Sequence, residues 1–141
     1  MRHAVFIVLL SFMSVDALAS DLRTQFVGKW RSDEPKTLES MRLHPEITDR
    51  VRKLFENKFF GRLVLVVTEK QSASYWAEEE GKAKLEFEPY EISEVGKDYL
   101  VVKYTNPMLD TKEKKRWYFE NGYMYTYTSK WKFREYFRKI Q

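Results

Sequence analysis

The sequence predicts a mainly β protein: an antiparallel up-and-down β-barrel of about eight strands with a helical insertion between strands 1 and 2. Three observations predict this fold. From residue 62 onward, short apolar and aromatic stretches alternate with turn residues, as in consecutive strands. Most of the connections are short, which favours pairing between sequence neighbours. A meander of this size can remove its exposed edges by closing into a barrel.

The first 19 residues are typical of a secretory signal peptide rather than of the folded domain. Arg2 and His3 precede an apolar stretch at residues 4–15, and Ala17-Leu18-Ala19 offers small residues to a signal peptidase. The apolar stretch is shorter than the roughly 20 residues that a membrane-spanning helix needs. We therefore expect cleavage near Ala19, one domain over residues 20–141, and a periplasmic or secreted location.

Composition limits the sources of stability and the classes of partner. The chain has no cysteine, so its stability must come from apolar burial, for which 43% hydrophobic and 16% aromatic residues suffice. The net charge is +4, from 25 basic and 21 acidic residues, so the surface is mixed rather than uniformly basic. A mildly positive field favours anionic lipids, fatty carboxylates or an acidic protein. Export argues against a nucleic-acid partner.

Residues 26–32, Phe-Val-Gly-Lys-Trp-Arg-Ser, form the first predicted strand. Side chains alternate between the two faces of a strand, so Phe26, Gly28 and Trp30 share one face and the basic residues between them share the other. We expect Phe26 and Trp30 to point inward, with Gly28 leaving room for a close neighbour. Gly28 and Trp30 are therefore predicted to be structural residues of barrel closure.

Two short helices are predicted between the first two strands. Acidic residues before Pro35 mark the start of the first helix, which ends before His44-Pro45. The second helix begins at Pro45 and ends at Gly61, and we expect it to cover one end of the sheet. Its apolar residues recur at helical spacing: Ile47, Val51, Leu54 and Phe55.

Strand patterns occupy the rest of the chain. The apolar alternation shifts by one residue at Pro89, which predicts a bulge or corner there. Asn121-Gly122 is a strong hairpin-turn dipeptide. The expected strands are residues 62–70, 72–79, 83–95, 98–105, 113–120, 123–128 and 131–139.

These features together resemble the calycin group of β-barrels, the lipocalins and the intracellular fatty-acid-binding proteins. Residues 26–31 resemble their first strand, a G-x-W motif between an aromatic and a basic residue. The helical segment 35–59 lies where fatty-acid-binding proteins carry a helical lid. Residues 134–138, Arg-Glu-Tyr-Phe-Arg, resemble their final strand, where R-x-Y followed by a basic residue grips a ligand carboxylate.

The resemblance implies a bacterial, exported lipocalin-like domain. Fatty-acid-binding proteins have more strands than we count here and are cytosolic, and the disulfides common in secreted lipocalins are absent. The likeness therefore supports the fold more than it supports any particular ligand.

The last strand leaves two orientations open. Its aromatic face, with Phe133 and Phe137, also carries Glu135, while Arg134 and Tyr136 lie on the opposite face. If the aromatic face points inward, the arginines are solvated, and one of them is expected to lie across Trp30 when the barrel closes. If the arginine face points inward, Arg134 and Tyr136 can hold an anionic head group.

The sequence predicts a binding protein for a small apolar or amphipathic ligand, with or without an anionic group. The alternative is a periplasmic protein-binding module with a filled barrel, such as an inhibitor, immunity factor or envelope-complex subunit, which the surplus of aromatic residues suggests. The face formed by Tyr123, Tyr125 and Tyr127 fits either cross-strand packing with Trp117 and Tyr118 or a wall for a ligand or protein. The candidate ligand-binding residues are Arg134, Tyr136, Arg138, Tyr125 and Trp117.

Catalysis finds little support in the sequence, and we expect neither an enzyme nor a metal or cofactor. His44 is the only histidine after the predicted cleavage point, and there is no cysteine. A hydrolase would have to use His44 or a pair of carboxylates that no spacing singles out. The basic cluster 112–116 and the acidic residues 78–80 are expected to be solvated.

Overall fold

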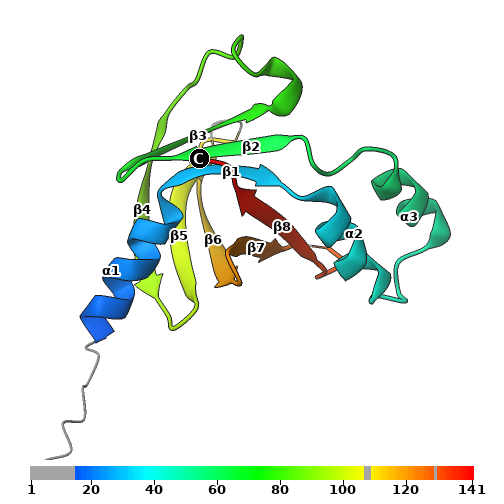
Figure 1. The fold of residues 1–141 in the computed structure, drawn as a ribbon, viewed down its shortest axis with the longest axis horizontal. Helices are drawn as coiled ribbons and strands as arrows, with labels where there is room; N and C mark the ends of the chain where they lie inside the picture. The colour runs from blue at the N-terminus through cyan, green and yellow to red at the C-terminus, as the bar shows by residue number, and fades with distance from the viewer. Residues whose placement is uncertain (1–14, 107–108, 129) are drawn as a thin grey trace, which may run out of the picture.

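A computed structural model describes residues 15–106, 109–128 and 130–141. Its eight strands form one closed antiparallel barrel in sequence order, and the last strand pairs back with the first (Figure 1). The predicted fold class is therefore confirmed, including the helical insertion between strands 1 and 2. The strands are β1 (Gly28–Ser32), β2 (Leu63–Val67), β3 (Gln71–Trp76), β4 (Glu88–Val95), β5 (Tyr99–Asn106), β6 (Thr111–Glu120), β7 (Tyr123–Tyr127) and β8 (Arg134–Lys139).

A helix, α1 (Val15–Phe26), precedes the barrel beside β4 and β5 (Figure 1). The prediction that Phe26 begins the first strand was wrong, because Phe26 ends this helix and the strand begins at Gly28. Phe26 is nevertheless buried, and it packs into the barrel core together with Leu22. Residues 1–14 of the predicted signal peptide lie outside the described residues. No helix within the described residues has the length and apolar character needed to cross a bilayer.

Closure of the barrel places Trp30 in its interior, with only 1% of the side chain exposed. A Cβ on Gly28 would lie 2.5 Å from Cε of Lys139, so glycine leaves the room that the sequence predicted. The cation beside Trp30 is Lys139, whose Nζ lies 5.2 Å from the ring centroid. The prediction of an arginine there was wrong: Trp30 is opposite Lys139 in the ladder, and Arg138 is opposite Arg31 on the outer face.

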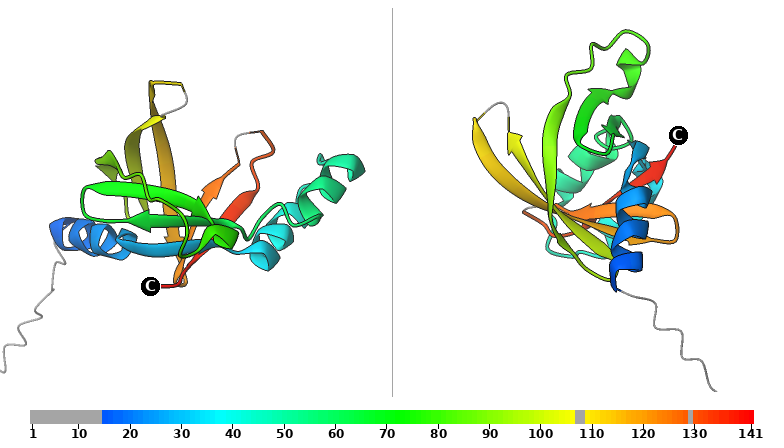
Figure 2. Two further views of the ribbon diagram at one scale, coloured as in Figure 1. Left: turned by 90° about the horizontal axis from the view of Figure 1, so that it is seen from above. Right: turned by 90° about the vertical axis from the view of Figure 1, so that its left-hand side faces the viewer.

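The insertion forms α2 (Glu34–Arg42) and α3 (Asp49–Glu56), which begin at the caps Asp33 and Thr48. Their apolar residues form a second core outside the barrel, and α3 lies at the far end of the insertion, away from the barrel (Figure 2). The expectation that the second helix covers an end of the sheet was therefore wrong, and α1 contributes buried side chains to the barrel instead. The second core comprises Leu38, Met41, Ile47, Phe55, Phe60 and Phe133.

Helix α2 protects an edge of the barrel. Only the second half of β8 pairs with β1, so backbone groups in its first half need other partners. The Ser40 hydroxyl accepts from Arg134 N at 2.9 Å, and the Thr37 hydroxyl accepts from Tyr136 N at 3.0 Å. Asp33 N donates to the Tyr136 carbonyl at 2.8 Å. The helix thus completes the hydrogen bonding of the strand.

The boundary between β3 and β4 is the most weakly paired part of the barrel. These strands share two residue pairs, whereas β5 and β6 share eight. The segment 77–87 leaves the sheet and forms the green excursion at the top of Figure 1. The predicted irregularity at Pro89 was misplaced, since Pro89 pairs with Gln71 and the register shifts between Ile92 and Glu94.

Candidate functional site

The interior of the barrel is apolar near Trp30 and polar further along the same strands. On β6 the inward side chains change from Phe119 and Trp117 to Lys115 and Glu113. On β8 they change from Phe137 to Glu135. The apolar end is built from Trp30, Leu100, Trp117, Phe119, Met124 and Phe137.

A pocket of about 440 Å³ occupies the polar half of the interior, so the barrel is not filled throughout. This volume lies within the range usual for small-molecule sites. The pocket extends along the weakly paired boundary between β3 and β4. Its lining has an apolar part and a polar part: the apolar part comprises Phe26, Leu65, Val67, Val102 and Trp117, and the polar part includes Lys84, Glu86, Glu88, Tyr104 and Lys115.

Lys115 is the one basic side chain that enters this pocket from the barrel wall. Its Nζ lies 4.9 Å from the ring centroid of Trp117. Burial lowers the pKa of Lys115, because a desolvated ammonium is disfavoured, and the negative charges of Glu135 and Glu113 oppose that shift. The site therefore presents a partly desolvated cation beside an aromatic wall.

Glu135 of β8 supplies a negative charge on the same interior face. Burial raises the pKa of its carboxyl, and the ammonium of Lys115 opposes the shift. The structure contains no ion pair of 4.0 Å or less between these two groups. Each charge is thus only partly compensated by the other, which leaves Lys115 available to another anion.

Glu113 is held at the polar end of the barrel by two donors. The Tyr104 hydroxyl donates to it at 3.0 Å and the Asn106 amide donates at 3.2 Å. Burial, and then the hydrogen bond to Glu113, raise the pKa of Tyr104. Glu113 is therefore already hydrogen-bonded, whereas Lys115 has no carboxylate in direct contact.

The structure separates the residues that the sequence predicted as one ligand-binding set. Trp117 lines the interior pocket, but Arg134, Tyr136 and Tyr125 lie on the outer surface, because Phe137 and Glu135 occupy the inward face of β8. The aromatic face is thus the inward one, and Arg134 and Tyr136 cannot hold a head group inside the barrel. Arg138, on the same outer face of β8, pairs at 3.8 Å with Asp33. Whether any of these residues contacts a ligand stays a prediction.

Lys115 and Glu113 were missed as interior residues. They belong to a run of charged residues, Lys112 to Arg116, that the sequence suggested to be a solvated edge. Alternation counted back from the aromatic residues Trp117 and Phe119 would have placed both inside. The high charge density of the run hid that alternation.

Tyrosines cover the outer surface of β5 to β8. Tyr118 stacks on Tyr125 with ring centroids 5.0 Å apart, and Tyr125 contacts Tyr136 at 5.2 Å. The guanidinium of Arg134 lies 4.5 Å from the Tyr125 ring centroid, and burial raises the pKa of Tyr125 to about 12. Cross-strand packing with Tyr118 is confirmed, but Trp117 points to the other face. We call this set the tyrosine surface: Tyr99, Tyr118, Tyr123, Tyr125, Tyr127 and Tyr136.

His44 lies at the junction of α2 and α3, far along the insertion from the interior pocket. Its Nδ1 is 3.0 Å from the Glu46 carboxylate, and Arg52 donates to its carbonyl at 2.8 Å. Within the described part of the chain, no group of three or more histidine, cysteine or acidic side chains is arranged to hold a metal ion. These contacts stabilise the junction between the helices.

Comparison with known proteins found no matching family model, no similar curated protein and no similar solved structure.

Proposed function

We propose that the protein is an exported, lipocalin-like binding protein that holds a small amphipathic ligand inside its barrel. The observation that carries the proposal is the pocket of about 440 Å³ with Lys115 on its wall. The apolar part of the ligand packs against Trp117, Val102 and Leu65, where its burial is favourable. Its polar group lies beside the ammonium of Lys115.

The chemistry of Lys115 favours an anionic head group over a neutral or cationic one. A carboxylate in the pocket would offset the desolvation that lowers the pKa of Lys115. It would also form a charge-assisted hydrogen bond in surroundings of low polarity. Glu135 does not line the pocket, so it does not occupy the position of the ligand.

Calorimetric titration with decanoate and decanol tests the proposal, because these probes share a chain and differ in charge. We expect decanoate to bind about 10-fold more tightly than decanol, a difference of about 1.4 kcal/mol. Lys115→Met removes this preference and leaves binding of decanol. Lys114→Met is the matched control, since Lys114 is exposed on the outer face of the same strand.

Three results would contradict the proposal: no binding of either probe, equal binding by the unmodified protein, or an unchanged preference in Lys115→Met. If Lys115→Met leaves Glu135 unpaired and the variant does not fold, the double variant Lys115→Met/Glu135→Gln carries the same test. Replacing both members of a buried charge pair is tolerated better than removing one.

A second function, protein binding, is favoured by one observation. In the tyrosine surface, Tyr127 is 43% exposed and Tyr125 and Tyr136 are covered, and Arg134 and Arg116 lie over its rings; tyrosine and arginine are enriched at protein interfaces. Native mass spectrometry of the protein purified from its own compartment distinguishes the two functions, because it detects either a small ligand or a partner chain. The same spectrum gives the mass of the mature chain and tests cleavage near Ala19.

A further inference from the structure

A groove of about 480 Å³ lies on the outside of the barrel between α2 and the strands β7 and β8. It is separate from the interior pocket, with which it shares no lining residue. Its lining combines charged, aromatic and apolar side chains, among them Lys36, Glu39, Leu43, Tyr127, Lys132 and Arg134.

The charges of the groove are mostly positive and incompletely neutralised. Lys36, Lys132 and Arg134 face a single acidic lining residue, Glu39. Arg134 pairs with Glu120 at 3.2 Å on the exposed surface. Within the described residues, no carboxylate lies within 4.0 Å of the ammonium of Lys36 or Lys132. The groove is therefore complementary to more than one negative charge.

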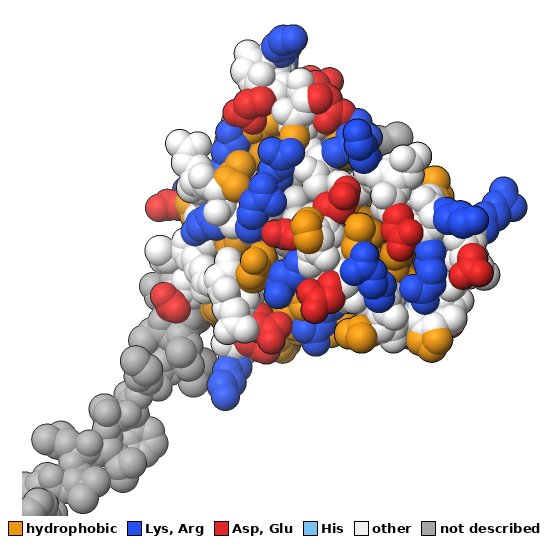
Figure 3. Space-filling model, turned by 45° about the vertical axis from the view of Figure 1, so that its right-hand side comes forward, with side chains coloured by type: hydrophobic (Ala, Val, Ile, Leu, Met, Phe, Trp, Pro, Cys, Tyr) orange, Lys and Arg blue, Asp and Glu red, His pale blue; other side chains and the backbone are white. Residues whose placement is uncertain are grey.

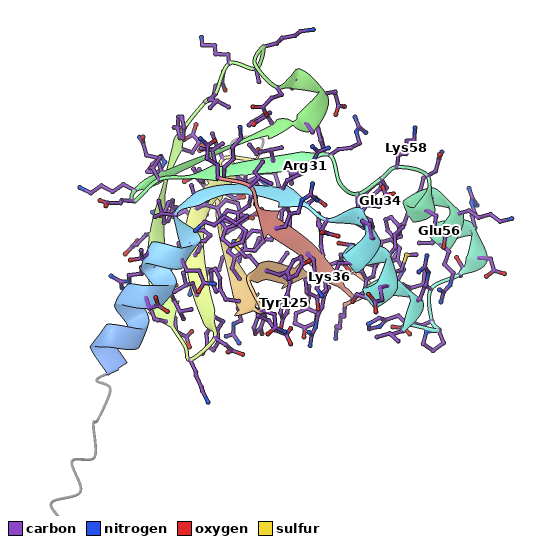
Figure 4. The ribbon with its side chains drawn as sticks, in the orientation of Figure 1. Arg31, Glu34, Lys36, Glu56, Lys58 and Tyr125 are labelled. Atoms are coloured by element: carbon purple, nitrogen blue, oxygen red, sulfur yellow. The ribbon has the colours of Figure 1, made fainter. Side chains whose placement is uncertain are left out.

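Aromatic rings hold two of these cations in place. Nζ of Lys36 lies 4.5 Å from the ring centroid of Tyr123 and 4.8 Å from that of Tyr136. Figure 4 shows Lys36 and Tyr125 on the same side of the molecule, below β8. Arg134 lies over the Tyr125 ring and donates to the Tyr136 hydroxyl at 3.2 Å. Cations that are already positioned lose less conformational entropy when they bind an anion.

Two apolar side chains at the groove are exposed to water. Leu43, just after α2, is 78% exposed, the highest value for a large hydrophobic residue in the described part of the chain, and Tyr127 of β7 is 43% exposed. The walls that carry them are joined by the hydrogen bonds from β8 to Thr37 and Ser40. A rigid groove with apolar contacts and several cations suits a short chain segment that alternates apolar and acidic side chains.

We infer that this groove binds an acidic peptide segment of a partner protein. An apolar side chain of the segment packs against Leu43 and Tyr127, and flanking carboxylates pair with Lys36, Lys132 and Arg134. This inference rests on the second proposed function, protein binding, and does not depend on a ligand in the barrel. An extended anionic surface fits less well, because basic and acidic side chains are intermixed over the side that carries α2 and α3 (Figure 3).

The peptide acetyl-Glu-Glu-Leu-Glu-Glu-amide is a suitable probe, with acetyl-Lys-Lys-Leu-Lys-Lys-amide as its charge-reversed control. We expect two-dimensional NMR to show shifts at Lys36, Ser40, Leu43, Lys132 and Arg134 with the acidic peptide alone. The affinity should fall as the salt concentration rises, because the charges of the groove are exposed.

Lys36→Glu is the decisive variant. Lys36 lies in the first turn of α2, where a glutamate is favourable to the helix dipole, and the bond from Lys36 N to the Asp33 carboxylate is kept, so folding should not suffer. We expect the acidic peptide to bind at least about 5-fold more weakly to this variant. Lys114→Glu makes the same change in net charge on a remote surface and should alter binding less than about 2-fold.

Leu43→Ser tests the apolar contact without a folding cost, since Leu43 is exposed. Equal weakening by Lys36→Glu and Lys114→Glu would show that only the overall charge attracts the peptide, and would overturn the inference. So would unchanged affinity in both Lys36→Glu and Leu43→Ser, or binding of heparin or anionic vesicles at this groove in preference to the peptide. Measuring decanoate binding to the Lys36→Glu variant tests the interior site separately from the groove.

Discussion

The inner and outer faces of β6 to β8 both carry basic residues, but they place them in opposite settings. Inside, Lys115 and Glu135 are partly desolvated. Burial lowers the pKa of Lys115 and raises the pKa of Glu135, which favours the neutral form of each group. Outside, a hydrogen bond with Tyr136 raises the pKa of Arg134, and Glu120 lies beside it in solvent. The interior charges therefore cost folding energy, while the exterior ones cost little.

This difference indicates different uses for the two faces. Partly compensated charge in the interior is unfavourable unless an anion binds there, in agreement with the small ligand that we propose. Charge held over aromatic rings in solvent is stable by itself and remains open to a macromolecular partner. Three pairs of variants test how sharply these settings differ.

The largest difference in the free energy of unfolding should come from truncating a core side chain and an outer one. Phe137→Ala, at a side chain 1% exposed, should lower the free energy of unfolding by about 3–5 kcal/mol, because it leaves a cavity among well-packed rings. Tyr127→Ala, on the outer face and 43% exposed, should cost less than about 1 kcal/mol. Urea denaturation measures both values. Similar losses would mean that the tyrosine surface is as important for stability as the barrel interior.

An intermediate loss of stability is expected for substitutions where α2 contacts β8. Thr37→Val keeps the side-chain volume but leaves Tyr136 N without its acceptor, which should cost about 1–3 kcal/mol. Ser40→Ala removes the corresponding acceptor at a less buried position, where water can replace it, and should cost less. Denaturation of the two variants is the measurement. A larger loss for Ser40→Ala would show that α2 does not protect the strand as described.

The smallest expected effect is on the pH dependence of the free energy of unfolding. Burial raises the pKa of Glu135 above its ordinary value of 4.5, so above pH 4.5 the folded protein retains a proton that the unfolded chain has released. This carboxyl therefore makes the free energy of unfolding fall as the pH rises from 4.5 through its folded-state pKa.

Glu135→Gln should flatten that pH dependence relative to the unmodified protein. Glu120→Gln, which makes the same chemical change on the outer face, is the control. Urea denaturation at a series of pH values compares them. If both variants show the same profile as the unmodified protein, the carboxyl of Glu135 is not desolvated as the structure indicates.

The closed barrel was predictable because short local sequence patterns specify its strands and turns. Each hairpin has its own turn residues, Asn121-Gly122 most clearly, and sequential pairing then leaves β1 and β8 as the only free partners. Trp30 and Gly28 were predictable for the same reason, since alternation along one strand assigns their face.

The residues that differ from expectation depend on long-range geometry. Lys139 rather than an arginine covers Trp30, because the register between two strands more than a hundred residues apart decides which cation is opposite the ring. Lys115 points inward because every second residue of β6 faces the core. The sequence did not reveal which set faces inward, since residues 112–116 are all charged. The docking of α2 on β8 through Thr37 and Ser40 has no local sequence pattern at all.

The pairing of β1 with β8 has a consequence for how the chain folds. It joins Trp30 to Lys139, so the contact that completes the barrel closes a loop that contains all of β2 to β7. Loop closure of that length is entropically costly, and proteins dominated by such distant contacts fold in milliseconds to seconds rather than in microseconds. Until β8 is in place, β1 and β7 each keep an unpaired edge, and Trp30 lacks the cation that covers its ring in the closed barrel.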